Sequence, residues 1–502
     1  MTAYDTLAAV DLGSNSFRLE VARIEGDQLY PLDALKETVR LAGGLSEDKL
    51  LDETTQQRAL ACLHRFGERL RGLPPGAVRC VGTSALRVAK NAPAFLQAAE
   101  AALGHRIEVV AGREEARLIY LGVAHGLPHS SLPRLVVDIG GGSTEFIVGK
   151  ELKPMQRESL HMGCVNFSQH FFPNGVISKA SMKAAELAAR VEVERIASEF
   201  NAANWHHAIG SSGTARALRD LLELNGFSAQ GITADGLNTL RNEMIKAGHV
   251  DRISLAGLRA DRRPVAAGGF AIMAGIFAEL GIEQMQVAET AMREGVLYDL
   301  LGRTHKQDMR DVTVDEFMRR YHVDATQATR VARVAHKLLG ALDDSVGKCE
   351  AGQNELALRH LNWASHLHEI GLSISHSGYH RHSGYILENA DMPGFSRSDQ
   401  ASLALLVRAQ RGALNKIPDV AAVAHAADAA RDTYLIWLLR QAVILCRSRA
   451  EPRLTGIQVE HTAKQYRLQF PDGWLARRPL TQKALEEEAG HWKALGVEYS
   501  FA

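Results

Sequence analysis

The chain has 502 residues, which is more than one hydrophobic core can serve, so several domains are expected. Its 46% hydrophobic and 23% charged residues are typical of a globular protein and argue against intrinsic disorder. Lys and Arg together number 58, as do Asp and Glu, which excludes a strong overall field that would attract a polyanion. Any basic binding track must therefore be local.

The N-terminal segment and the cysteines predict a cytoplasmic protein. Residues 1–17 have no basic stretch followed by an apolar one, and Asp11 and Gly13 interrupt their hydrophobic run, which argues against secretion. No apolar run approaches the roughly 20 residues that a transmembrane helix requires. The five cysteines lie far apart and lack CxxC spacing, so we expect reduced thiols and neither disulfides nor a zinc site.

The first third of the chain predicts alternating strands and helices. Residues 8–17 comprise a hydrophobic run that ends in Asp11, a glycine-containing turn and the start of a second strand. After a turn at residues 25–27, a third β-like run completes a meander. The patterns that follow are a helix at Glu53 to Leu70, strands at Val78 to Gly82 and Ile107 to Val110, and a helix that opens at Glu114.

The next segment repeats this order. Residues 136–146 again form a hydrophobic run ending in an aspartate, Asp138, followed by a glycine-rich turn and a second strand. The later patterns are a helix at Ser181 to Phe200, a strand at His206 to Ile209 and a helix at Ala215 to Leu224. The repetition predicts two similar α/β domains that face each other across a cleft.

The rest of the chain has a different pattern. From Asp311 to Arg447 the strand signals disappear and Ala/Leu-rich helical periodicity replaces them. The tail then alternates at Ile457 to His461 and at Tyr466 to Phe470, and a helix and a last strand follow. We predict two α/β domains at 1–124 and 125–310, an all-α domain at 311–447 and a small α+β domain at 448–502.

The two Asp-x-Gly turns predict a phosphate and magnesium site. Backbone N–H groups of a turn such as Gly140 to Ser143 can approach an anion closely because no Cβ intervenes. Opposed Asp11 and Asp138 suit Mg²⁺, which prefers one or two carboxylates together with water and phosphate oxygens. A tight hairpin for the glycine turn, and a helix cap or Asx-turn for each aspartate, are the alternatives.

Several motifs together resemble the exopolyphosphatase/guanosine pentaphosphate phosphatase family. They are DLGSNSFR at 11–18, GTSALR at 82–87, GREEARL at 112–118, DIGGGSTE at 138–145, GSSGT at 210–214 and PVAAGG at 264–269. The resemblance implies duplicated α/β domains of the actin–hexokinase–Hsp70 (RNase H-like) fold. It further implies that the all-α domain is HD-like and that the small α+β domain closes a long, four-domain member of the family.

The resemblance also implies roles for individual residues. Glu115 orients or deprotonates the attacking water, and Glu114 is the less favoured candidate because adjacent helical residues point about 100° apart. Arg87 offers a donor fork to phosphate, and Asp138, Asp11 and Glu145 bind Mg²⁺. The expected phosphate-binding residues are Ser14, Asn15, Ser16, Thr83, Ser84, Gly140, Gly141, Gly142, Ser143, Thr144, Ser211, Ser212, Gly213 and Thr214.

The helical region contains a histidine-rich segment, which includes His366, His368, His376, His380 and His382. An active HD metal site needs a His-Asp pair, whereas this chain has His368-Glu369, which speaks against a second metallophosphatase site. With Arg381, Arg397, Arg408 and Arg411 the histidines suggest either a basic track for a linear polyanion or an ordinary solvated helix face.

The function implied by the resemblance is Mg²⁺-dependent, processive removal of terminal orthophosphate from inorganic polyphosphate. The alternative within the family is the same attack on guanosine pentaphosphate. A kinase of the same superfold and a non-catalytic nucleotide sensor or assembly module are the readings from other classes. The resemblance also implies a homodimer, leaves open a monovalent cation such as K⁺ and peripheral attachment to the inner membrane, and gives no reason to expect nucleic acid as a partner.

Overall fold

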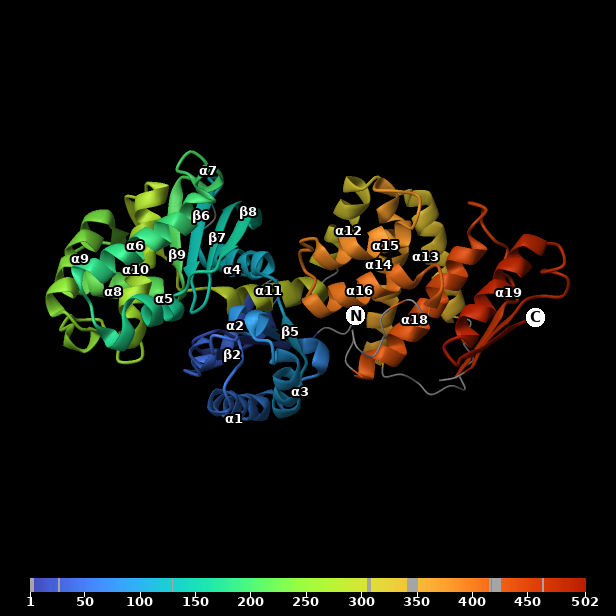
Figure 1. Ribbon diagram of the computed structural model, residues 1–502, viewed down its shortest axis with the longest axis horizontal. Coiled ribbons are helices and arrows are strands. Elements are labelled where there is room, and N and C mark those ends of the chain that lie inside the picture. The colour runs from blue at the N-terminus through green and yellow to red at the C-terminus, as the bar shows by residue number, and fades with distance from the viewer. Residues whose placement is uncertain are drawn as a thin grey trace. The chain divides into compact units, whose positions relative to one another are not determined.

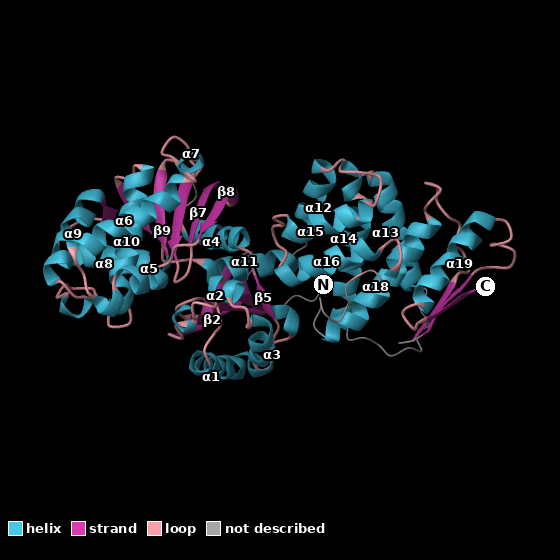
Figure 2. Cartoon of the chain, in the orientation of Figure 1, coloured by secondary structure: helices cyan, strands magenta, loops and turns pink. Residues whose placement is uncertain are grey.

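The computed structural model describes residues 4–25, 28–128, 130–304, 308–340, 351–414, 417, 426–462 and 465–502. The chain divides into two compact units, unit 1 at residues 1–308 and unit 2 at residues 309–502. Figure 1 labels their elements, and Figure 2 shows that strands are concentrated in unit 1 and near the C-terminus.

The first half of unit 1 is a five-stranded sheet of order β3-β2-β1-β4-β5. Strands β1 and β2 pair antiparallel, as do β2 and β3, whereas β1, β4 and β5 run parallel. The strands are β1 (Thr6–Leu12), β2 (Phe17–Glu25), β3 (Gln28–Glu37), β4 (Val78–Gly82) and β5 (Ile107–Val109), and the helices are α1 (Glu53–Leu70), α2 (Ser84–Val88), α3 (Ala92–Leu103) and α4 (Gly112–Gly126).

The second half has a six-stranded sheet of order β10-β11-β9-β6-β7-β8. Its strands are β6 (Arg134–Ile139), β7 (Thr144–Lys150), β8 (Lys153–Leu160), β9 (His207–Ser211), β10 (Ile232–Thr233) and β11 (Gln284–Val287). Strands β8-β7-β6-β9-β11 repeat the order and directions of β3-β2-β1-β4-β5. The predicted duplication is confirmed, and β10 is an addition at one edge.

The helices of the second half are α5 (Cys164–Phe171), α6 (Lys179–Glu194), α7 (Ala197–Phe200), α8 (Ser212–Leu224), α9 (Ala234–Ala247), α10 (Ala266–Leu280) and α11 (Met292–Thr304). The helix predicted from Ser181 to Phe200 is interrupted, since α6 ends at Glu194 and α7 begins at Ala197. Helix α8 begins at Ser212, three residues before the predicted start, and this early start places Ser212 and Gly213 in its first turn.

The alternation of side chains along the central strands explains how the two halves join. Ala8 and Val10 of β1 pack with α1 and α3, and Leu135 and Val137 of β6 pack with α6 and α10. The intervening residues Leu7, Ala9 and Val136 belong to another buried cluster, together with apolar side chains of α4 and α11. Helices α4 and α11 therefore lie between the two sheets and carry their N-terminal residues toward the ends of β1 and β6.

One helical stretch of the described residues, Arg263–Leu280, is long and apolar enough to cross a membrane by length and composition. The sequence-based expectation that no run reaches this length is therefore corrected. The stretch is 67% buried within the fold, and α10 packs against α5 and α6 in the core of the second half. Its apolar composition is thus explained by burial on several sides, which is common for a core helix.

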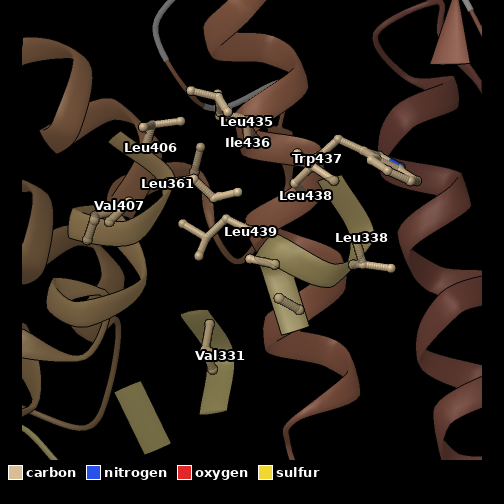
Figure 3. Packing of buried hydrophobic residues seen from close by; sticks show 14 of the residues in the cluster. Val331, Leu338, Leu361, Leu406, Val407, Leu435, Ile436, Trp437, Leu438 and Leu439 are labelled. Carbon is tan, nitrogen blue, oxygen red and sulfur yellow. The ribbon is translucent and has the colours of Figure 1, made fainter. Parts of the chain in front are cut away.

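Unit 2 contains helices α12 (Met309–Arg320), α13 (Ala325–Gly340), α14 (Ala351–Leu367), α15 (Tyr379–Asn389), α16 (Arg397–Ala409), α18 (Ala426–Leu445) and α19 (Pro479–Lys493). A three-stranded sheet is formed by β12 (Gln458–Thr462), β13 (Gln465–Gln469) and β14 (Glu498–Phe501). One continuous apolar cluster extends from the helices to Tyr466, Leu468 and Trp492. Figure 3 shows its centre, where Leu361 and Leu406 lie near Leu435 and Leu439 of α18.

The predicted helical character of residues 311–447 agrees with these elements. The HD-like identity of this region and the division of the chain into four domains stay predictions. Four cysteines are buried free thiols, as predicted: Cys62, Cys80, Cys164 and Cys446. Cys349 lies outside the described residues.

Candidate active site

A pocket lies between the two halves of unit 1, where β1 and β6 end. It is lined by Asp11, Gly13, Ser14, Asn15, Ser16, Arg18, Thr83, Glu115, Ile119, Asp138, Ile139, Gly140, Gly141, Ser143, Cys164, Ser212, Gly213, Arg216, Arg262, Ala291, Met292 and Arg293. The two glycine-containing turns approach each other closely, since a Cβ atom added at Gly141 would lie 2.9 Å from the Ser14 Cβ. The structure thus brings the two predicted phosphate turns into one site.

Two carboxylates from the two halves meet in this pocket. The pKa of Asp11 is raised to about 7. Burial is the main cause, Glu115 and Asp138 contribute to the rise, and Arg18 opposes it. Burial likewise raises the pKa of Asp138 to about 6, although a hydrogen bond from Ser211 opposes the shift. Asp11 Oδ1 and Ser16 Oγ are buried without a hydrogen-bond partner among the described residues. These atoms are suited to a ligand that supplies positive charge or donors.

The two carboxylates suit a hard cation that needs few ligands from the protein. Mg²⁺ usually binds one or two protein carboxylates and takes its other oxygens from water and phosphate, and Asp11 and Asp138 meet that requirement. The described residues contain no group of three or more His, Cys, Asp or Glu side chains disposed to hold one ion. Glu145, predicted as a third ligand, does not line the pocket, and its Oε1 instead accepts a hydrogen bond of 2.9 Å from Ser159.

The raised pKa values of Asp11 and Asp138 lead to a prediction about stability. The folded protein binds these two protons more tightly than the unfolded chain, so the metal-free protein loses stability from this source as pH rises from about 4 to about 7. A cation that binds the ionised carboxylates should restore it. We expect Mg²⁺ to raise the Tm clearly more at pH 8 than at pH 5.5, measured by calorimetry. An equal Mg²⁺ effect at both pH values contradicts this prediction.

Glu115 lines the pocket from the first turn of α4. Its Oε2 lies 2.5 Å from the Arg87 Nη1, and Arg87 also donates to the backbone oxygen of Val110 at 3.0 Å. Arg87 itself does not line the pocket, so the structure places it as a partner of Glu115 rather than as a direct phosphate ligand. An arginine in this position holds the carboxylate in one orientation.

Glu114 points elsewhere, as the helical geometry predicts for one of two adjacent glutamates. It is 4% exposed, does not line the pocket and receives two hydrogen bonds of 2.8 Å from Arg117. Of the two glutamates, only Glu115 is therefore placed to reach a molecule in the pocket.

The predicted phosphate-binding residues separate into two groups. Those that line the pocket are Ser14, Asn15, Ser16, Thr83, Gly140, Gly141, Ser143, Ser212 and Gly213, and those that do not are Ser84, Gly142, Thr144, Ser211 and Thr214. Members of the second group support the loops from behind. The hydroxyl of Thr144 donates to Met162 O at 2.6 Å, and that of Thr214 donates to Ile139 O at 3.0 Å.

The first turn of α8 contains an unusual backbone conformation. Ser212 has φ 81°, a value that residues other than glycine, Asn and Asp rarely adopt. Such strain of roughly 1–3 kcal/mol is found mainly where a structure must present groups to a ligand. Ser212 lines the pocket with Gly213, and its Oγ accepts hydrogen bonds from Thr214 N at 3.1 Å and Ala215 N at 3.4 Å. The positive end of this 13-residue helix favours an anion there.

Four arginines that the sequence reasoning did not single out also line the pocket: Arg18, Arg216, Arg262 and Arg293. Arg293 pairs with Glu20 at 3.0 Å, and Arg216 donates to Glu289 O at 3.0 Å. Arg18 and Arg262 form no hydrogen bond or ion pair with another residue that the structure describes. Burial and then the charge of Arg293 lower the pKa of Arg18 to about 10. The pocket therefore holds two uncommitted arginines, Arg18 and Arg262, whose guanidinium groups are suited to bind a polyanionic ligand.

Arg18 could have been found from the sequence. Residue 18 lies directly opposite Asp11 in the β1–β2 hairpin, so both side chains lie on one face of the sheet. The equivalent pair in the second half is Asp138 and Glu145. The duplication thus pointed to position 18 as strongly as to position 145, whereas no motif marks Arg262 in its loop.

The histidine-rich segment lies in unit 2. His368 is buried, and its Nδ1 lies 2.7 Å from the Ser365 backbone oxygen, while His366 Nδ1 lies 2.8 Å from Asn362 O. Arg408 pairs with Glu388. Several side chains of the predicted basic track are therefore bonded to other residues of unit 2. The track stays a prediction.

Comparisons with known proteins identify the family to which the chain is similar. A profile described as the Ppx/GppA phosphatase family matches residues 20–304, and one described as Ppx/GppA phosphatase, domain III, matches residues 309–489. The chain is 38% identical over 489 residues to the guanosine-5′-triphosphate,3′-diphosphate pyrophosphatase of Pseudoalteromonas translucida, and 36% identical over 490 residues to that of Aeromonas hydrophila. Each alignment covers 97% of both chains.

Similar solved structures match part of the chain's length. An exopolyphosphatase from Cytophaga hutchinsonii has a TM-score of 0.54 at 24% identity and covers 59% of this chain and 98% of its own. A Ppx/GppA family member from Aquifex aeolicus has a TM-score of 0.50 at 25% identity, with coverage of 60% and 98%. These likenesses agree with the actin-like fold expected for the duplicated domains.

Proposed function

The chain belongs to the Ppx/GppA phosphatase family, whose members hydrolyse phosphoanhydrides, and from this premise we propose that it removes the terminal 5′-phosphate of guanosine pentaphosphate. The products are guanosine tetraphosphate and orthophosphate. The observation that carries the proposal is the convergence of Glu115, two opposed aspartates and four arginines on one pocket between the halves of unit 1.

The relatives favour the nucleotide over inorganic polyphosphate. Proteins named as guanosine-5′-triphosphate,3′-diphosphate pyrophosphatases are similar to this chain over 97% of its length, unit 2 included. The likeness to a named exopolyphosphatase is below 25% identity and supports the fold alone. The order of the two readings in the sequence analysis is therefore reversed: the nucleotide becomes the main proposal and polyphosphate the alternative.

The residues of the pocket divide the work of hydrolysis. Glu115 orients a water molecule for in-line attack on the terminal phosphorus and accepts its proton, while the bond to the bridging oxygen breaks. The N–H groups of the turns at Ser14 to Ser16 and Gly141 to Ser143 donate to phosphate oxygens. Arg18 and Arg262 offset the charge that the substrate brings into a partly buried site.

Asp11 and Asp138 would hold Mg²⁺ at the point where the two halves meet. When bound, this cation neutralises phosphate charge and orients the oxygens of the terminal group. In its absence burial disfavours the ionised form of both carboxylates, which is the main cause of the raised pKa of each.

A direct competition between substrates tests the proposal. The pure protein with Mg²⁺ is given guanosine pentaphosphate or long-chain polyphosphate, and orthophosphate release and remaining substrate are followed by anion-exchange chromatography. We expect kcat/KM to be higher for the nucleotide. Faster release from polyphosphate would overturn the proposal in favour of the alternative, and incubation with ATP and acceptor alcohols controls for kinase activity.

The two uncommitted arginines lead to a prediction about affinity. Replacement of Arg18 or Arg262 by alanine should raise KM for guanosine pentaphosphate by about 10–100-fold, because a hydrogen bond to a charged group contributes roughly 1.5–3 kcal/mol. The effect on kcat should be smaller, since neither side chain acts on the water. Initial rates over a range of substrate concentrations separate the two constants.

A matched control for Arg18→Ala is Arg23→Ala. Arg23 lies on the same strand, β2, but its side chain is 53% exposed and pairs with Glu25 away from the pocket. KM should be unchanged in this variant. If Arg18→Ala behaves like Arg23→Ala, Arg18 does not contact the substrate.

A further inference from the structure

A buried ionic network includes Glu114, the residue next to Glu115. It joins three arginines and three acids: Arg79 of β4, Glu108 of β5, Glu114 and Arg117 of α4, and Asp299 and Arg303 of α11. The charges balance within the network. Arg79, Arg117 and Asp299, at its centre, have side chains that are 1%, 4% and 4% exposed.

Asp299 connects α11 to α4 and to β4. One carboxylate oxygen binds Arg117 of α4, and the other lies 2.6 Å from the Arg79 Nη1 and 3.1 Å from the Arg303 Nε. These three guanidinium groups hold the pKa of Asp299 well below its usual range, despite burial. The carboxylate is therefore a permanent anion between two helices and a strand.

Arg117, which binds Asp299, also binds Glu114, the residue next to Glu115. Its Nε and Nη2 each donate to Glu114 at 2.8 Å, a two-bond arrangement that allows one orientation of the glutamate. Since Glu114 and Arg117 both belong to α4, the bond that anchors the helix to a second element is the one from Arg117 to Asp299 of α11. An anchored α4 also fixes the direction of Glu115, which points about 100° away from Glu114 around the helix. A rotation of α4 that moved Glu115 out of the pocket would break the bond between Arg117 of α4 and Asp299 of α11.

Helices α4 and α11 are also in backbone contact, which leaves little freedom for sliding. A Cβ atom added at Gly122 would lie 1.9 Å from Ala291 O, and one added at Gly295 would lie 1.8 Å from Leu118 O. Figure 1 labels both helices within unit 1. Helix α11 begins at Met292, beside the pocket arginine Arg293, so one rigid pair carries Glu115 on one member and Arg293 on the other.

Stability alone does not explain so many buried charges. Replacement of buried ion pairs by packed apolar side chains is often neutral or stabilising, so such a network is better explained by the conformation that it specifies. We propose that Asp299, Arg117 and Arg79 are positioning residues that set the rotation of α4, so that Glu115 faces the reacting phosphate and Glu114 is held away. This inference rests on the proposed role of Glu115 in hydrolysis.

A double-mutant cycle in the full chain tests it. Asp299→Asn keeps the shape of the side chain but removes the central charge, and we expect kcat to fall by about 10-fold or more with KM little changed, since misplacement by about 1 Å can cost 10²-fold. In the Glu115→Gln background the same change should cause almost no further loss. Asp299→Glu, which keeps the carboxylate, should recover part of kcat.

Controls separate positioning from loss of folding. Glu186→Gln removes another ion-pair partner of unit 1, bound to Arg241 at 2.6 Å and outside the pocket, and should leave kcat unchanged. If Asp299→Asn does not fold, as judged by circular dichroism, Glu114→Gln enters the same cycle, with a smaller loss expected.

The outcomes are distinct. An equal loss of kcat in the wild-type and Glu115→Gln backgrounds, or no loss in either, overturns the positioning role. Failure of the wild-type protein to hydrolyse guanosine pentaphosphate and polyphosphate refutes the proposed function instead, and it is recognised before any variant is made.

Discussion

Replacement of Glu115 by glutamine should lower kcat for guanosine pentaphosphate by about 10²–10⁴-fold, the range of lost acid–base assistance. Glutamine keeps the size of the side chain and can still accept from Arg87, but it cannot take a proton from water. Since Glu115 contributes negative charge to a site for a polyanion, KM should be unchanged or lower. Single-turnover measurements of orthophosphate release, in which enzyme exceeds substrate, report the chemical step directly.

A suitable control for Glu115→Gln is Glu68→Gln. Glu68 lies on α1 with a side chain that is 57% exposed, and the replacement removes the same charge far from the pocket lining. Its kcat should equal that of the wild type. Turnover of Glu115→Gln within the error of this control would remove Glu115 from the mechanism.

Asp138→Asn should have the second largest effect, which concerns the metal. The Mg²⁺ concentration needed for half-maximal activity should rise by at least about 10-fold, because even outer partners of metal ligands contribute 10–100-fold to affinity. The pH dependence of the Mg²⁺ effect on Tm should weaken in the same variant, since one of the two titrating carboxylates has been removed. Activity measured over a range of Mg²⁺ at saturating substrate gives the first quantity, and calorimetry gives the second.

Asp235→Asn provides the comparison for Asp138→Asn. Asp235 lies in the first turn of α9, is exposed and does not line the pocket. The Mg²⁺ titration of this variant should match that of the wild type. An unaltered titration in Asp138→Asn as well would refute the metal-binding role of Asp138.

Much of the fold followed from local patterns. Residues Glu53–Leu70 and Val78–Gly82 have the predicted bounds, because an amphipathic helix with an aspartate cap and a short buried strand are specified by neighbouring residues. The repeat around Asp11 and Asp138 predicted the duplication. The break between α6 and α7, and the early start of α8 at the strained Ser212, depend on contacts from outside the segment and were not foreseen.

The candidate site was predicted only in part, because some of its residues are marked by local motifs and others are not. Turn residues such as Asn15, Gly140 and Ser143 are marked by motifs, since a tight approach to phosphate restricts which residues fit. Arg262 and Arg293 come from a loop and a helix start that carry no such restriction. They join the site only because two segments distant in sequence converge on it.

Local sequence patterns were enough to predict that the chain has two related α/β domains, that each presents an aspartate and a phosphate turn, and that one of two adjacent glutamates faces the cleft. The packing of remote elements settles which arginines enter the pocket, that Arg87 binds Glu115, and that Asp299 of α11 binds Arg117 of α4. The physical reason is the range of the interactions. Turns and helical faces are set by neighbours along the chain, whereas a buried charge is stabilised by whichever partner the packing of remote elements supplies.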